Sequence, residues 1–159
     1  MMRALIIIVL IGALMWGAPQ GVKIVKSQLN RGIRNNNPLN IRISNNAWTG
    51  KVTPSQDKAF ETFSDHKYGF RAAAKLVRNY QMLYGLNSIN EIIGRWAPSH
   101  ENDTANYSQF VAGQLNVSPN AALNLADNEL LARLVHAMSI MEVGRYYSLS
   151  DAKQGVALV

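Results

Sequence analysis

A run of twelve residues, 31–42, contains the side chains best suited to bind a polar ligand. It reads Arg-Gly-Ile-Arg-Asn-Asn-Asn-Pro-Leu-Asn-Ile-Arg, and Trp48 follows shortly after it. The amides of Asn36, Asn37 and Asn40 can both donate and accept hydrogen bonds. A tryptophan ring offers a flat apolar face of the kind that packs against a sugar ring. We therefore predict that these residues contact a ligand with many hydroxyl groups. The alternative is an Asn-rich turn that opens a β-hairpin, with Trp48 in the core.

Breaking a glycosidic bond requires a carboxyl group that donates a proton to the leaving oxygen, so the ten acidic residues are the candidates. Glu142 stands out because it continues an apolar series at helical spacing, which predicts partial burial. That series consists of Leu131, Val135 and Met138. Glu142 also falls in the last turn of its predicted helix, where the helix dipole disfavours an anion. Both effects favour the neutral form that a general acid needs. The alternative is a helix-end carboxylate that is hydrated or paired with Arg145.

A second carboxylate could orient a water molecule or stabilise positive charge at the anomeric carbon. Glu61 is the candidate, because the nearby Asp65 is well placed to cap the following helix. If Glu142 acts alone, the N-acetyl group of the sugar could assist, as in a transglycosylase. Tyr107 follows a polar loop, residues 101–104, and is a further candidate substrate contact. Helix capping by Thr104 is the alternative explanation of that loop.

Composition narrows the possible chemistry. The chain has no cysteine, and its three histidines lack the spacing of metal ligands. It also lacks a Ser-His-Asp arrangement and a glycine-rich phosphate loop. We expect neither a metal nor an organic cofactor. The net charge is +6, which favours a polyanionic partner such as the acidic polymers of a bacterial wall, anionic lipid or nucleic acid.

The first 22 residues predict an export or membrane signal. Residues 4–18 are apolar and lie between Arg3 and Pro19. Fifteen helical residues reach about 22 Å, less than the roughly 30 Å of a hydrocarbon core. The run therefore fits an uncleaved signal-anchor, with Arg3 inside and the rest in the periplasm; a buried core helix is the alternative. Behind such a signal nucleic acid is the least expected partner. Residues 23–159 are assigned to one domain.

The patterns within residues 23–159 predict an α+β, mainly helical domain with one small β-hairpin lobe. Residues 41–43 alternate as a strand does, Asn45 and Asn46 supply a turn, and Trp48 begins the return strand. This hairpin would bring the asparagine run and Trp48 to one side of the domain.

Five helices are expected after the hairpin. The first has an apolar face from Phe70 to Tyr84 and ends at Gly85. The others begin at the cap signals Ser88, Thr104, Ser118 and Asp127. The last helix continues to Gly144 and carries Glu142.

Three segments, residues 36–41, 48–50 and 60–63, resemble the hairpin region of lysozyme-like peptidoglycan hydrolases. Residues 31–38, which read Arg-Gly-Ile-Arg-Asn-Asn-Asn-Pro, are similar to a run found in small phage virion and lysis proteins, and that likeness extends over roughly residues 31 to 158. Residues 136–144, with the serine and the Gly-containing apolar segment that follow, resemble the catalytic helix of lytic transglycosylases. In that family the catalytic helix precedes the hairpin. The resemblance therefore implies a circularly permuted arrangement, which explains why no Asp or Glu precedes the hairpin here.

This resemblance implies a phage or prophage endolysin or lytic transglycosylase. It would cleave the bond between N-acetylmuramic acid and N-acetylglucosamine for host lysis or wall penetration. Glu142 would be the general acid, glycan strands the partner, and the N-terminal helix a tether to the host inner membrane, facing the periplasm, or to a virion membrane. The alternatives are a non-catalytic virion membrane protein that binds the wall with a hydrolase-like fold, and a basic nucleic-acid-binding protein.

Overall fold

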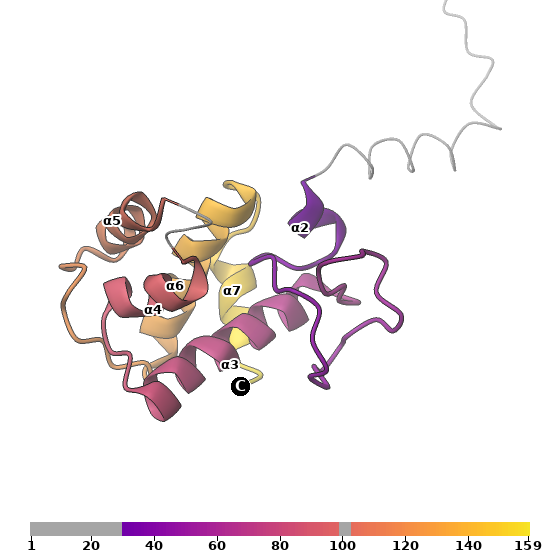
Figure 1. Ribbon diagram of the computed structural model, residues 1–159, viewed down its shortest axis with the longest axis horizontal. Coiled ribbons are helices and arrows are strands. Elements are labelled where there is room, and N and C mark those ends of the chain that lie inside the picture. The colour runs from indigo at the N-terminus through magenta and orange to yellow at the C-terminus, as the bar shows by residue number, and fades with distance from the viewer. Residues whose placement is uncertain (1–29, 99–102) are drawn as a thin grey trace, which may run out of the picture.

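The computed structural model describes residues 30–98 and 103–159, which form a mainly helical structure (Figure 1). The predicted signal-anchor, residues 1–22, lies outside the described residues. The helices are α2 (Arg31–Arg34), α3 (His66–Tyr84), α4 (Ile89–Trp96), α5 (Thr104–Leu115), α6 (Asn128–Val143) and α7 (Leu149–Val156). In the part of the chain that the structure describes, no helix has both the length and the apolar character needed to cross a bilayer.

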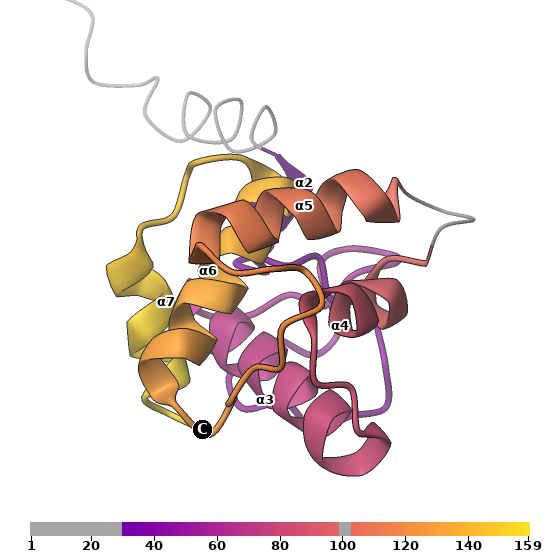
Figure 2. The same ribbon diagram turned by 90° about the vertical axis from the view of Figure 1, so that its left-hand side faces the viewer.

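Helix α3 is the long helix that the sequence predicted, and it runs along one side of the molecule (Figures 1 and 2). Asp65 caps its first turn by accepting a hydrogen bond from the Lys67 backbone N–H at 2.9 Å. Gly85 ends it in the left-handed conformation at φ 67°. Phe70 and Val77 are fully buried on its inner face. The predicted apolar stripe therefore anchors α3 in the core from Phe70 to Val77, whereas Tyr84 at its end is exposed.

Helices α4 and α6 also begin where their cap signals predicted. Ser88 forms a complete capping box with Glu91 at the start of α4. Asp127 accepts hydrogen bonds from the first backbone N–H groups of α6, and Gly144 follows the last residue of that helix. At α5 the cap is Asp103, whose side chain accepts from the Asn106 N–H at 3.1 Å, and Thr104 is the first helical residue.

The predicted helix at Ser118 is wrong. Ser118 and Pro119 belong to a single turn closed by a hydrogen bond from the Ala121 N–H to the Ser118 carbonyl, at 3.0 Å. Leu123 and Leu125 are buried beyond that turn and hold the connection to α6 against the core. Helices α2 and α7 were not predicted, although Ser148 and Asp151 form a capping box at the start of α7.

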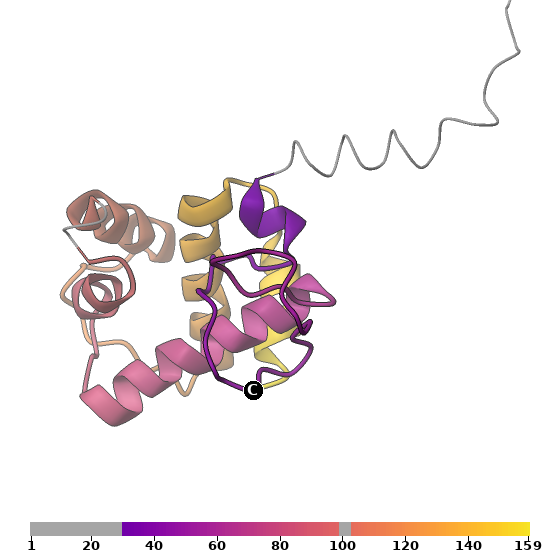
Figure 3. The ribbon, with the colours of Figure 1, turned by 45° about the vertical axis from the view of Figure 1, so that its right-hand side comes forward.

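Residues 35–64, here called the small lobe, lie near the N-terminal end of α3, and α4 and α5 lie toward its other end (Figure 3). The predicted pairing of residues 41–43 with the segment beginning at Trp48 is wrong. Arg42 instead pairs with Phe60, and the Glu61 N–H donates to the Ile41 carbonyl at 2.9 Å. The lobe is therefore mostly loop, with short antiparallel contacts.

Asn37 explains this pairing. Its fully buried amide donates to the carbonyls of Ile41 and Glu61, both at 2.9 Å, and its oxygen accepts from the Ile41 N–H at 2.8 Å. Because one side chain satisfies three backbone groups, it fixes residue 41 beside residue 61. The small lobe also approaches α3 closely at Gly69, where a Cβ atom would lie 2.5 Å from the Asn36 carbonyl oxygen. The small lobe thus packs directly on the backbone of α3.

Candidate functional site

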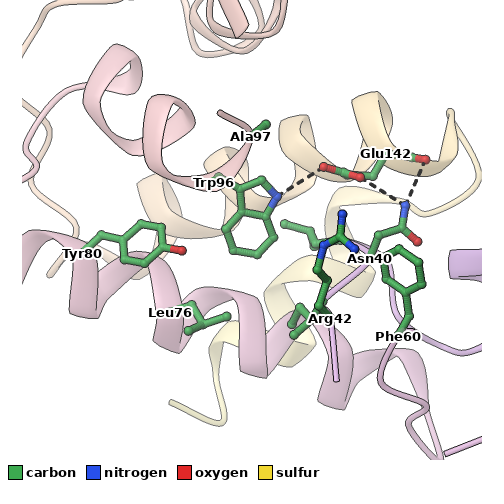
Figure 4. A pocket seen from close by; sticks show the side chains of 10 residues that line it. Asn40, Arg42, Phe60, Leu76, Tyr80, Trp96, Ala97 and Glu142 are labelled. Atoms are coloured by element: carbon green, nitrogen blue, oxygen red, sulfur yellow. Dashed lines mark hydrogen bonds between the residues drawn. The ribbon is translucent and has the colours of Figure 1, made fainter. Parts of the chain in front are cut away.

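A pocket with a volume of about 590 Å³ lies between the small lobe and helices α3, α4 and α6 (Figure 4). Its lining is a mixture of aromatic, aliphatic, amide and charged side chains. The residues that line it are Leu39, Asn40, Ile41, Arg42, Phe60, Leu76, Tyr80, Trp96, Ala97 and Glu142. Glu142 is the only acid in this lining among residues 30–98 and 103–159. A pocket of this size can enclose part of a small organic ligand or a few sugar units.

The Glu142 carboxylate is held by three neutral donors from three different segments. The Trp96 indole N–H of α4 donates to Oε1 at 3.2 Å, and the Tyr107 hydroxyl of α5 donates to the same oxygen at 3.1 Å. The Asn40 amide donates to Oε2 at 3.1 Å and also lies 3.5 Å from the Glu142 main-chain oxygen. Three bonds from fixed donors leave this carboxylate little freedom to rotate.

Local backbone geometry brings Asn40 to Glu142. Asn40 has φ 48°, a left-handed conformation that asparagine tolerates better than most residues. Gly32 lies behind it: a Cβ there would be 2.5 Å from Val143 Cγ1 and 2.7 Å from Asn40 Oδ1. A larger residue at position 32 would therefore push α2 away from the end of α6. The glycine and asparagines of the run are needed for this close packing.

Tyr107 approaches Glu142 from the interior. Its side chain is buried, and the hydroxyl lies 3.3 Å from the Met138 carbonyl oxygen as well as 3.1 Å from Glu142 Oε1. Burial, together with the neighbouring Glu142 carboxylate, raises the pKa of Tyr107 well above its usual value. The phenol therefore keeps its proton, and it acts as a hydrogen-bond donor to Glu142 throughout the physiological pH range.

The pocket continues from Glu142 along an aromatic wall. Trp96 lies between Glu142 and Tyr80, and the Trp96 and Tyr80 rings are 6.4 Å apart in an edge-on arrangement (Figure 4). At the other end, the Arg42 guanidinium lies 5.5 Å from the centre of the Phe60 ring. The pocket thus has flat apolar faces on both sides of the carboxylate.

The structure brings together three of the seven residues predicted to form the site. Asn40 and Tyr107 both contact Glu142, but Tyr107 is buried and lies outside the pocket lining, so it holds Glu142 rather than facing a substrate. Asn36 and Asn37 lie outside the pocket lining, because their amides bind the backbone of the small lobe: Asn36 donates to the Phe63 carbonyl at 3.0 Å. Trp48 also lies outside the lining and packs, half-buried, against the core, as the alternative interpretation proposed.

Glu61 is not brought to the pocket either. Its side chain is fully buried in the small lobe, where Oε1 lies 3.0 Å from Lys51 Nζ and accepts from the Ser44 backbone N–H at 3.0 Å. An ion pair with these additional bonds stabilises a loop-rich lobe, provided that neither partner is removed. The position of Glu61 therefore indicates a structural role and separates it from Glu142.

Several lining residues were missed by the sequence analysis, above all Trp96 and Tyr80. Trp96 ends the helix that the Ser88 capping box opens, and Tyr80 lies on the predicted long helix. Their exposure to a pocket depends on how α3 and α4 pack, which no local pattern encodes. No group of three His, Asp or Glu residues that could hold a metal ion occurs within the described ranges.

These features define a class: a mainly helical domain with a half-buried glutamate, fixed by side-chain donors, in the wall of an aromatic-lined pocket. No protein-family model matches the chain. The sequence is 41% identical over 145 residues to Protein P5 of Pseudoalteromonas phage PM2, and the alignment covers 87% of this chain and 89% of that protein. The chain belongs to the family of this phage protein. The name of the relative describes no activity.

Proposed function

We propose that this chain is a phage peptidoglycan hydrolase of lysozyme-like fold. It would cleave the glycosidic bond between N-acetylmuramic acid and N-acetylglucosamine, with Glu142 as the general acid. The observation that carries the proposal is the position of Glu142, whose carboxylate lines a pocket of about 590 Å³ while three side chains hold it in place. Proton donation to a leaving glycosidic oxygen requires a carboxyl group held in a fixed position beside the site where the substrate binds.

The lining supports a saccharide substrate. Trp96, Tyr80 and Phe60 supply ring faces for the apolar faces of sugars, while Asn40 and Arg42 supply polar groups for hydroxyl and N-acetyl groups. Such alternation of flat apolar and polar surface suits a carbohydrate better than a purely apolar ligand.

The Asn40 amide can form a hydrogen bond with either the ionised or the neutral form of the Glu142 carboxyl group. Its amide nitrogen faces Oε2, while its buried Oδ1 has no hydrogen-bond partner in the part of the chain that the structure describes. Trp96 and Tyr107 both donate to Oε1, so the proton of a neutral Glu142 belongs on Oε2. If the Asn40 amide group rotated by half a turn, Oδ1 would accept a hydrogen bond from the protonated Oε2 of Glu142. Asn40 could therefore hold both forms of the acid in the same place.

The number of acids favours one of two reaction paths. Glu142 is the only carboxylate that lines the pocket within residues 30–98 and 103–159. A pair of carboxylates flanking the bond is the usual requirement for retaining and inverting glycosidases. With one acid, the N-acetyl group of the substrate takes the second role, and we propose a lytic-transglycosylase type of reaction that leaves an anhydro end.

The order of the elements supports the permuted relation to lytic transglycosylases. The small lobe precedes α6, which carries Glu142, and the pocket lies between them. We further propose that residues 1–22 tether the protein to the host inner membrane or a virion membrane, as part of host lysis or wall penetration. The net charge of +6 would hold the domain on the anionic wall.

The test uses the full-length chain and purified peptidoglycan, with the soluble products identified by mass spectrometry. Glu142→Gln keeps the shape of the side chain and removes its proton donor, so we expect cleavage to fall by about 10²- to 10⁴-fold. Glu129→Gln is the matched control, because Glu129 lies on the same helix and its exposed side chain pairs with Lys153. Anhydro ends in the products would identify the transglycosylase path.

Two results would contradict the proposal. Equal cleavage by the Glu142→Gln and Glu129→Gln variants would show that another group is the acid. Tight binding of peptidoglycan without release of any fragment would favour a non-catalytic wall-binding protein.

A further inference from the structure

The row of aromatic side chains that begins at the pocket continues beyond it along α3. Tyr80 lines the pocket, and Tyr84 follows it by one helical turn on the same face. One turn along a helix advances about 6 Å for four residues, similar to the length of one pyranose unit. Because α3 carries Tyr84 away from Glu142, the row extends the pocket outward rather than widening it.

Arg95 of α4 connects the two tyrosines. Its guanidinium carbon lies 5.0 Å from the centre of the Tyr80 ring and 4.0 Å from that of Tyr84. Both distances are within the range of cation–π attraction, which favours one orientation of each ring. Tyr84 nevertheless leaves 56% of its surface exposed, although it is a large aromatic residue. The exposed part of the Tyr84 ring therefore offers a surface on which a ligand ring can stack.

We propose that Tyr80, Arg95 and Tyr84 form an extension of the pocket that binds further sugar units of a long N-acetylated glycan strand. This inference rests on the proposed function and adds a place on α3 and α4 where sugar units beyond the pocket beside Glu142 would bind. Tyr84 stacks against a sugar ring, and Arg95 donates to the hydroxyl or carboxylate oxygens of the same strand.

The alternative is that these three residues only stabilise the junction of α3 and α4. That alternative predicts a loss of stability on mutation and no effect that depends on the length of the ligand. An extended site predicts the opposite pattern, since only a long strand reaches Tyr84.

The test measures binding by the full-length Glu142→Gln protein, which keeps the substrate intact. The two probes are peptide-free glycan strands of many disaccharides and a single N-acetylglucosamine–N-acetylmuramic acid disaccharide. Adding Tyr84→Ala should weaken binding of the strands by about threefold to tenfold and leave binding of the disaccharide unchanged. Tyr84→Phe, which keeps the ring, should restore strand binding. Tyr146→Ala is the matched control, because Tyr146 is 58% exposed, close to the value for Tyr84, and lies outside the pocket lining.

Three outcomes would overturn the inference: equal strand binding by the Tyr84→Ala and Tyr146→Ala variants, an equal loss for strands and disaccharide, or no strand binding by the Glu142→Gln parent. None of them decides the proposed function, because cleavage by the wild-type chain is measured separately. Conversely, a Tyr84-dependent affinity for strands without any cleavage would retain this site and reject the catalytic role of Glu142.

Discussion

Replacing Asn40 by Asp tests the central contact of the site directly. The Asn40 amide nitrogen donates to Glu142 Oε2 at 3.1 Å, so Asn40→Asp would bring a second carboxylate into that contact. Two negative charges at this distance repel by about 1 kcal/mol at the dielectric constant of water and about 5 kcal/mol at an effective value of 20. The folded variant can relieve the repulsion by binding one shared proton. Against an ordinary carboxyl value near pH 4, that proton costs about 4 kcal/mol at pH 7. We therefore expect a loss of about 1–4 kcal/mol in the free energy of unfolding at pH 7.

The free energy of unfolding of the Asn40→Asp variant should depend on pH, and the shared proton determines the direction of that dependence. Above about pH 4 the folded variant holds a proton that the unfolded chain has released. The free energy of unfolding then decreases as pH rises, by at most about 1.4 kcal/mol for each pH unit, and the loss disappears below pH 4. The matched control is Asn40→Gly, because glycine accepts the φ of 48° without strain and carries no charge. Urea unfolding of both variants between pH 3.5 and 8 is the assay. If their difference is the same at every pH, the amide does not donate to Glu142 and the arrangement of the site is wrong.

Two further substitutions test two contacts independently: the hydrogen bond between Tyr107 and Glu142, and the ion pair between Lys51 and Glu61 in the small lobe. Tyr107→Phe removes the hydroxyl that lies 3.1 Å from Glu142 Oε1, and we expect urea unfolding to show a loss of about 1–3 kcal/mol; wild-type stability would mean that this bond is not made. Lys51→Ala leaves the Glu61 carboxylate buried without its cation, so it should lower the free energy of unfolding by about 3–5 kcal/mol while cleavage per folded molecule stays unchanged. Loss of cleavage in fully folded Lys51→Ala protein would return Glu61 to the list of catalytic candidates.

The sequence carried enough local information to locate Glu142 and most of the helix ends. Asp65, Ser88 and Asp127 cap helices through bonds to backbone groups only two or three residues away, so their signals are short-range and readable. The partial burial of Glu142 was predicted from a different local signal, its helical spacing from Leu131, Val135 and Met138, and the structure confirms it. The turn at Ser118 was misread because serine followed by proline suits both a helix start and an isolated turn.

The different hydrogen-bond partners of Asn37 and Asn40 could not be predicted from the sequence, because they depend on contacts between distant segments. Asn37 and Asn40 are only three residues apart, yet one binds the backbone of the small lobe and the other reaches a carboxylate 102 positions later in the chain. The same run of polar residues predicts ligand contacts for both. Trp96 and Tyr80 went unnoticed for the same reason, since only the packing of α4 on α3 makes their rings a pocket wall.

The contacts around Asn40 connect the small lobe to the end of α6, on opposite sides of the pocket. Within the lobe, the Asn37 amide joins residues 41 and 61 by donating to both of their carbonyl groups. Asn40 of the lobe binds Glu142 at the end of α6, while Gly32 of α2 lets that helix approach Val143 closely. Any separation of the lobe from α6 must therefore break the hydrogen bond between Asn40 and Glu142. Under the proposed function, a bound strand that separated the lobe from α6 would release Oε2 of Glu142, while Trp96 and Tyr107 would still hold Oε1.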